Sequence, residues 1–233
     1  MAINCYLAMT AAEIHRNPQL PPHIGWMACH FSPYGLGLSN LPDTLPESSL
    51  LILNDRIPIC GHDSQIIARQ LAQCAAQTHC SGILLDFQRT DEPETEALKE
   101  HLLKASPCPI AVALPYAAAN QPVFLPPVPM DTPIESYLAP WRGREIWLEV
   151  SSQPQCLRLT PEGCFTEAAG KSSSDTPLLH EPGLHCHYKI EPHDNSVDFH
   201  FLRTREDLES LLADAENLGV TRAVGLWQEL REK

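Results

Sequence analysis

One segment of the sequence carries polar side chains in a pattern that could do chemistry. Within Cys80–Arg89, the acidic Asp86 and the amide Gln88 stand two residues apart after an apolar run. Successive side chains of a β-strand point to opposite faces, so Leu84, Asp86 and Gln88 share one face. A carboxylate there can carry a proton or orient a polar ligand. The plainer interpretation is that Asp86 caps the next helix or accepts hydrogen bonds from loop amides.

The elements around this segment alternate between strand-like and helical patterns. Three runs, apolar almost throughout, indicate strands buried on both faces: Ser49–Asn54, Gly82–Phe87 and Ile110–Leu114. Helices are predicted between them, from Asp63 to Thr78 and from about Glu94 to Lys104. This order predicts parallel strands with helices packed over them.

The C-terminal part repeats this order after a different middle region. A helix is predicted from Thr204 or Arg205, Gly219 ends it, and Val220–Trp227 follows as a strand. Arg144–Val150 is a further predicted strand, and residues 155–203 alternate in the manner of antiparallel strands and turns.

We therefore predict an α/β fold in one domain over residues 1–233. Three weaker strands, Cys5–Met9, Trp26–Phe31 and Val123–Leu125, bring the set close to eight. The expected architecture is a shortened (β/α)8 TIM-type barrel, with residues 155–203 as a β-rich insertion before the last βα unit. The alternative is a doubly wound sheet, which needs a glycine-rich phosphate turn. The one candidate turn, Tyr34–Leu38, lacks the third glycine.

Ser81–Gln88 resembles the fourth strand of family 18 glycoside hydrolases, which include the chitinases and spore-cortex N-acetylglucosaminidases. That strand carries D-G-x-D-x-D-x-E, and here Gly82 matches its glycine, Asp86 its last aspartate and Phe87 an aromatic position. The similarity covers residues 49–116 and 185–230. It implies a barrel with a cleft for N-acetylated glycans and Trp227 as an aromatic floor.

The departures from the family motif imply a degenerate site. The family's acid is a glutamate, whereas Gln88 has no ionisable proton, and general acid catalysis contributes about 10²–10⁴-fold. Ser81 and Leu84 replace the first two aspartates, and Asp131 only echoes the family's Met-x-Tyr-Asp motif. The first hypothesis is a glycoside hydrolase-like protein that binds N-acetylglucosamine-containing glycans through Asp86 and Gln88 without family-type hydrolysis.

Two other hypotheses stay open. A relocated carboxylate could supply the missing proton: Asp91 or Glu92 on the following loop, Asp55 after the preceding strand, or Asp131. The plainer interpretation of Asp91 and Glu92 is that acidic residues favour a helix start. A non-enzymatic interaction module would instead present an apolar patch from the N-terminal 45 residues, including Trp26, Phe31 and Tyr34.

Five of the eleven histidines fall between His180 and His200. His185 and His187 form an H-x-H pattern, which on a strand would place both imidazoles on one face for a zinc ion. No H-E-x-x-H or cysteine pair supports this pattern, so the main expectation is that the protein needs no metal or other cofactor.

Composition excludes several partners. The net charge of −13 disfavours nucleic acid and anionic membranes, and no apolar run approaches the ~20 residues of a membrane span. The N-terminus lacks the pattern of a secretory signal. The cysteines, nine in number, show no C-x-x-C spacing, which is typical of reduced thiols in a cytoplasmic protein.

Overall fold

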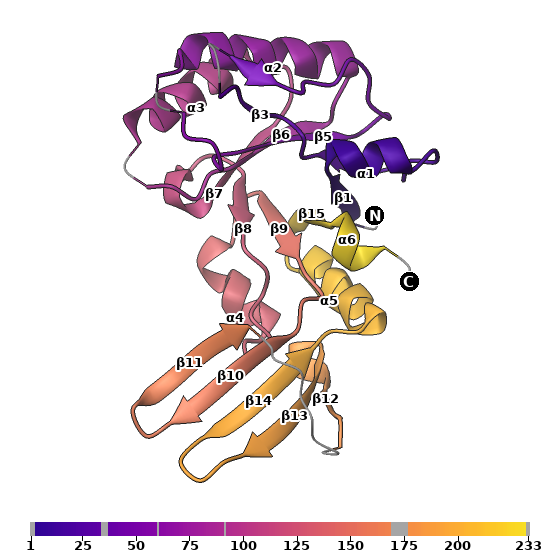
Figure 1. Ribbon diagram of the computed structural model, residues 1–233, viewed down its shortest axis with the longest axis vertical. Coiled ribbons are helices and arrows are strands. Elements are labelled where there is room, and N and C mark those ends of the chain that lie inside the picture. Colours follow the sequence, from indigo (N-terminus) through magenta and orange to yellow (C-terminus); the bar gives the residue numbers. More distant parts are fainter. Residues whose placement is uncertain (1–2, 34–36, 60, 91, 169–176, 232–233) are drawn as a thin grey trace.

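A computed structural model describes residues 3–33, 37–59, 61–90, 92–168 and 177–231. Its centre is a closed barrel of parallel strands (Figure 1). In order around the barrel these are β1 Asn4–Met9, β2 Ile24–Trp26, β5 Leu50–Asn54, β6 Gly82–Asp86, β7 Ile110–Ala113, β8 Val123–Leu125, β9 Ile146–Val150 and β15 Val220–Leu226. The predicted TIM-type barrel is thus confirmed.

The covering helices are few and several are short. They are α1 Ala11–Arg16, α2 Ser64–Thr78, α3 Pro93–Ala105, α4 Ile134–Leu138, α5 Arg205–Asn217 and α6 Trp227–Leu230. A two-stranded ribbon, β3 His30–Phe31 and β4 Leu38–Ser39, stands between β2 and β5 in place of a helix. None of the described helices combines the length and apolar character needed to cross a membrane.

The ends of the long helices follow the sequence signals. Asp63 accepts hydrogen bonds from the backbone amides of Gln65 and Ile66 and so begins α2. Thr204 and Asp207 form a capping box at the start of α5. Gly219, with φ of 95°, takes the left-handed conformation that ends this helix.

The predicted β-rich insertion is a five-stranded antiparallel sheet, here called the insertion sheet. Its order is β11-β10-β14-β13-β12, with β10 Gln155–Thr160, β11 Gly163–Ala168, β12 Leu179–Glu181, β13 Cys186–Pro192 and β14 Val197–Leu202. Figure 1 shows it at the end of the molecule opposite α2 and α3. Gln155 and Phe201 are cross-strand partners, so the two ends of the insertion meet where it joins the barrel.

The predicted strand Trp26–Phe31 is wrong in its bounds. Barrel strand β2 ends at Trp26, and Phe31 belongs to the β3–β4 ribbon. Phe31 is 1% exposed in the apolar layer beneath α2, and the Trp26 indole packs on the same layer while donating to the carbonyl of Asn40. These two side chains therefore do not form an exposed patch, and Tyr34 lies outside the described residues.

Large side chains fill the barrel interior in place of a channel. Tyr6, Leu84, Phe124 and Trp147 are among the residues of this inner cluster. Trp147 is fully buried, and a β-carbon on Gly82 would lie 2.6 Å from its ring. Glycine at the start of β6 therefore leaves room for the indole.

Candidate functional site

Asp86 points into the barrel at the carboxyl end of β6. Ile83, Leu85 and Phe87 pack outward against the layer beneath α2 and α3, while Leu84 packs in the inner cluster. Strand alternation therefore turns Asp86 inward, where it is partly buried. Active sites of such barrels are built at this carboxyl face, which we call the barrel mouth.

Gln88 lies on the rim beside Asp86. The strand ends at Asp86, so Gln88 belongs to the next loop, but its Nε2 donates to Asp86 Oδ1 at 2.7 Å. Burial raises the pKa of Asp86, the hydrogen bond from Gln88 opposes this shift, and the negative charge of Asp55 adds to it. Asp86 and Gln88 are thus paired, although Gln88 lies beyond the strand on which the sequence pattern placed it.

Glu149 is a second inward carboxyl group that the sequence analysis missed. On β9, Ile146, Leu148 and Val150 pack outward, whereas Trp147 fills the interior, so alternation turns Glu149 inward near the end of its strand. Burial raises its pKa to about 7, and the charges of Asp86 and Glu229 act in the same direction. The sequence signal that could have identified Glu149 is a charged residue near the end of an apolar strand, as at Asp86.

Trp227 begins α6, directly after β15. The side chain is partly buried, and its indole Nε1 is inaccessible to solvent and has no hydrogen-bond partner among the described residues. In the same short helix, Glu229 accepts hydrogen bonds from Ser151 Oγ and Gln153 Nε2, each at 2.6 Å. The loop after β9 is thereby tied to the helix that carries Trp227.

These groups give the mouth a defined chemistry. Asp86 is an acceptor and Glu149, with its pKa of about 7, can donate a proton or a hydrogen bond near neutrality. The Gln88 amide adds hydrogen-bonding capacity. Such a set suits a neutral ligand with many polar groups.

Asp55 has a positioning role in the structure. It is 6% exposed, and its Oδ2 accepts hydrogen bonds from the backbone amides of Gln88 and Arg89 at 2.8 and 2.6 Å. Arg89 Nε also donates to the carbonyl of Asp55 at 2.9 Å. The carboxylate therefore fixes the loop that carries Gln88.

Asp131 and Glu92 have other contacts in the structure. Asp131 is exposed, accepts from Thr132 Oγ1 and lines a cavity of about 220 Å³ against the insertion sheet, to which β6 and β9 contribute nothing. Glu92 is the N-cap of α3 and accepts from Thr95 Oγ1 at 3.3 Å. Asp91 lies outside the described residues.

The predicted pairing of His185 with His187 on one strand face is wrong. His185 precedes β13 with a φ of 49°, and its ring contacts Ser210 and Asp214, each at 3.1 Å. His187 lies within β13, and its Nδ1 is 2.9 Å from Asp207 Oδ2. The turn before the strand directs the two imidazoles to different partners.

Comparison with solved structures finds similar barrels. A chitinase from Chromobacterium violaceum superposes with a TM-score of 0.58 at 12% identity, covering 96% of this chain and 93% of the other. A glycoside hydrolase family 18 N-acetylglucosaminidase from Paenibacillus barengoltzii gives 0.57 at 8% identity, with coverages of 97% and 94%. The spore cortex-lytic enzyme SleL from Bacillus cereus gives 0.55 at 9% identity, with coverages of 96% and 70%.

No protein-family model matches the sequence, and no curated protein matches it. At identities near 10%, the structural likeness establishes the fold. The resemblance predicted from Ser81–Gln88 is therefore confirmed for the fold alone. The chain has the same barrel fold as these chitinases, family 18 N-acetylglucosaminidases and spore cortex-lytic enzymes.

Proposed function

We propose that the protein binds an N-acetylated glycan at the barrel mouth and does not catalyse family-type hydrolysis. The observation that carries this proposal is the hydrogen-bonded pair of Asp86 and Gln88 at the end of the fourth barrel strand, 2.7 Å apart. Asp86 can accept from an acetamido N–H, as the resemblance implies. Gln88 stands where an acid is needed and has no proton to give.

Trp227 contributes an apolar surface to the proposed site. The face of an indole can stack on a sugar ring. The neighbouring Glu229 is fixed by Ser151 and Gln153, which keeps α6 in place.

Titration calorimetry with N-acetylglucosamine oligomers and peptidoglycan fragments tests the binding proposal. We expect saturable binding by the wild type and at least about tenfold weaker binding by Trp227→Ala. Trp141→Ala is the matched control, because Trp141 precedes β9 and so lies at the opposite end of the barrel from the mouth. No binding by the wild type at millimolar ligand, or equal binding by Trp227→Ala, contradicts the proposal.

A second candidate function is hydrolysis with Glu149 as the acid. The observation that favours it is the pKa of about 7, which leaves this carboxyl group half protonated at neutral pH. Release of reducing ends from chitooligosaccharides by the wild type, lost in Glu149→Gln and kept in Gln88→Ala, would support it. No turnover by the wild type would eliminate it and leave binding as the function.

From composition, we also propose a cytoplasmic location and no nucleic-acid partner. The nine cysteines show no C-x-x-C spacing, which is typical of reduced thiols in a reducing compartment. The net charge of −13 would repel a phosphate backbone. Filter binding with DNA and RNA at low salt should therefore detect no retention.

A further inference from the structure

We propose that His180, His187 and Asp207 form a binding site for a divalent transition-metal ion, with Zn²⁺ as the best match. The site lies where the insertion sheet meets α5, and it is independent of the glycan site proposed above. Two imidazoles and one carboxylate are the ligand types that zinc prefers alongside thiolate.

Strand register brings the two histidines together. His180 on β12 and His187 on β13 are direct cross-strand partners in an antiparallel pair, a position that holds side chains close on one face. Their rings stack with centroids 4.5 Å apart and an interplanar angle of 27°. Both rings face the start of α5, where Asp207 is the third helical residue.

The spacing of the donor atoms suits one ion. His180 Nε2 lies 3.2 Å from Asp207 Oδ1, and His187 Nδ1 lies 2.9 Å from Asp207 Oδ2. All three groups offer a ligand atom within 4.8 Å of the others. Ligands held about 2.1 Å from a tetrahedral zinc ion stand roughly 3.4 Å from one another, so small side-chain rotations complete the arrangement.

The neighbouring Thr204 holds the Asp207 carboxylate in place through its backbone amide and its hydroxyl group. The two Thr204 bonds reach Oδ2 at 2.8 Å each and orient the carboxylate. Partners of this kind fix the orientation of metal ligands in known sites.

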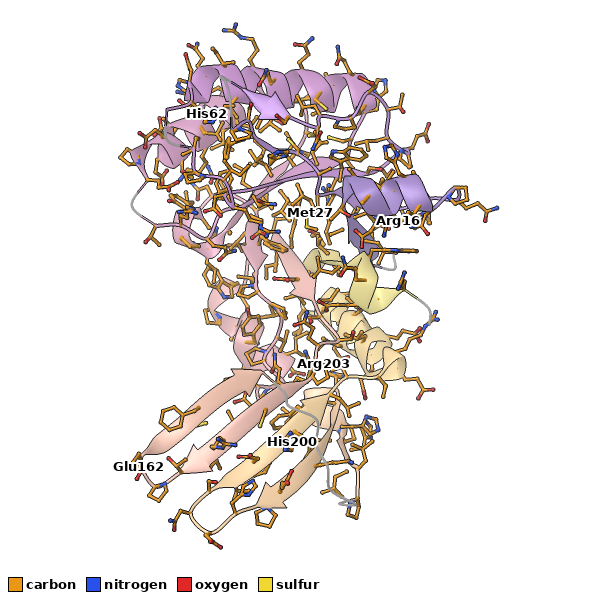
Figure 2. All side chains as sticks on the ribbon, viewed as in Figure 1. Arg16, Met27, His62, Glu162, His200 and Arg203 are labelled. Atoms are coloured by element: carbon orange, nitrogen blue, oxygen red, sulfur yellow. The ribbon has the colours of Figure 1, made fainter. Side chains whose placement is uncertain are left out.

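The ion would be reached from solvent and would join two parts of the fold. The His180 side chain is 47% exposed, so water can enter and occupy a fourth position. Arg203, labelled at the same junction in Figure 2, donates from Nε to the carbonyl of His185 and from Nη1 to that of Val128. A bound ion would add a further link between the insertion sheet and α5, which packs on the barrel.

A second described cluster, Cys156, Asp198 and His200, suits a metal less well. Asp198 already accepts from Arg158 Nε and Nη2, both at 2.8 Å, and its Oδ2 is 3.2 Å from His193 Nε2. An ion there would have to displace a bidentate ion pair, which is a strong interaction. The cluster around Asp207 contains no such pair in the described residues.

Zinc titration of the untagged, full-length protein against a competing chromophoric chelator tests the site. We expect one tight equivalent in the wild type and at least about tenfold weaker binding in His180→Ala and in His187→Ala. At a free zinc concentration of about 100 times Kd, the melting temperature should rise by roughly 5–10 °C. His193→Ala is the control, because this partly exposed histidine also contacts an aspartate of the insertion sheet.

The spectrum of the cobalt-substituted protein distinguishes this site from one with cysteine ligands. The proposed ligands predict d–d absorption without a thiolate-to-cobalt charge-transfer band. No saturable zinc binding by the wild type, unchanged binding by the double variant His180→Ala/His187→Ala, or a thiolate band in the cobalt spectrum would overturn the proposal. Circular dichroism of each variant confirms that loss of binding is not loss of fold.

Discussion

Replacing Glu149 by glutamine should stabilise the protein above pH 7 and change its stability little near pH 4.5. Burial, with the charges of Asp86 and Glu229, raises the pKa of Glu149 from 4.5 to about 7. Between these values the folded chain keeps a proton that the unfolded chain has lost. Because the folded state binds more protons, the free energy of unfolding falls as the pH rises through this window. Glutamine cannot ionise, so the free energy of unfolding of the variant does not fall in this pH window.

The magnitude follows from the width of the window. The interval from 4.5 to about 7 corresponds to at most ~3.4 kcal/mol, at about 1.4 kcal/mol for each pH unit. Water reaches the partly buried carboxyl group and screens its charge, so we expect about 2 kcal/mol at pH 8. For a chain of this length that is a rise of roughly 4–8 °C in melting temperature.

Thermal unfolding of the wild type and Glu149→Gln at pH 4.5, 6, 7 and 8 measures the effect. Glu100→Gln is the matched control, because it makes the same chemical change on the exposed face of α3. The two melting curves should separate progressively between pH 4.5 and 8. A constant difference across this range, or a less stable Glu149→Gln at pH 8, would refute the electrostatic reasoning.

Three further changes test other parts of the structure. Gly82→Ala should destabilise the barrel by about 1–3 kcal/mol in urea unfolding, because its β-carbon would overlap the Trp147 ring; an unchanged midpoint would contradict this packing. Thr204→Ala removes the cap of α5 and should cost about 1 kcal/mol in the same assay, whereas no loss would mean that the cap is dispensable. The hydrogen bond from Cys80 lowers the pKa of Cys108 to about 7. Diamide should therefore oxidise this pair, 3.8 Å apart, to a disulfide with transfer of two hydrogen atoms to the reagent, and peptide mass mapping that finds both thiols intact would count against it.

The strands buried on both faces could be predicted almost residue by residue. Leu50–Asn54, Gly82–Asp86 and Ile110–Ala113 are short runs of almost wholly apolar residues that only a covered parallel strand accommodates. The three-residue strand Ile24–Trp26 has no such signal. Its neighbour Phe31 is buried by packing beneath α2, a long-range contact that local sequence does not encode.

Some residues of the barrel mouth could also be predicted from local sequence patterns. Asp86 follows from alternation along β6, and Gln88, in the loop after the strand, is hydrogen-bonded to it. Glu149 joins them only because barrel closure brings β9 and β6 to face one another, although they are far apart in the sequence. The partner of His187 was misidentified for a related reason. Sequence spacing pointed to His185, whereas the cross-strand register between β12 and β13 selects His180.

Because Gln155 and Phe201 are cross-strand partners, the insertion sheet shortens the route by which the barrel closes during folding. Pairing β9 with β15 across an unstructured chain would restrict a loop of roughly 70 residues. Once the sheet has formed, the flexible connection falls to about 25 residues, which saves about 0.9 kcal/mol of loop-closure entropy. A sheet that forms early therefore lowers the entropic barrier to the pairing of β9 with β15, which is a non-local contact. Joining Gln155 directly to Phe201 should leave a sequence whose barrel strands still meet in order.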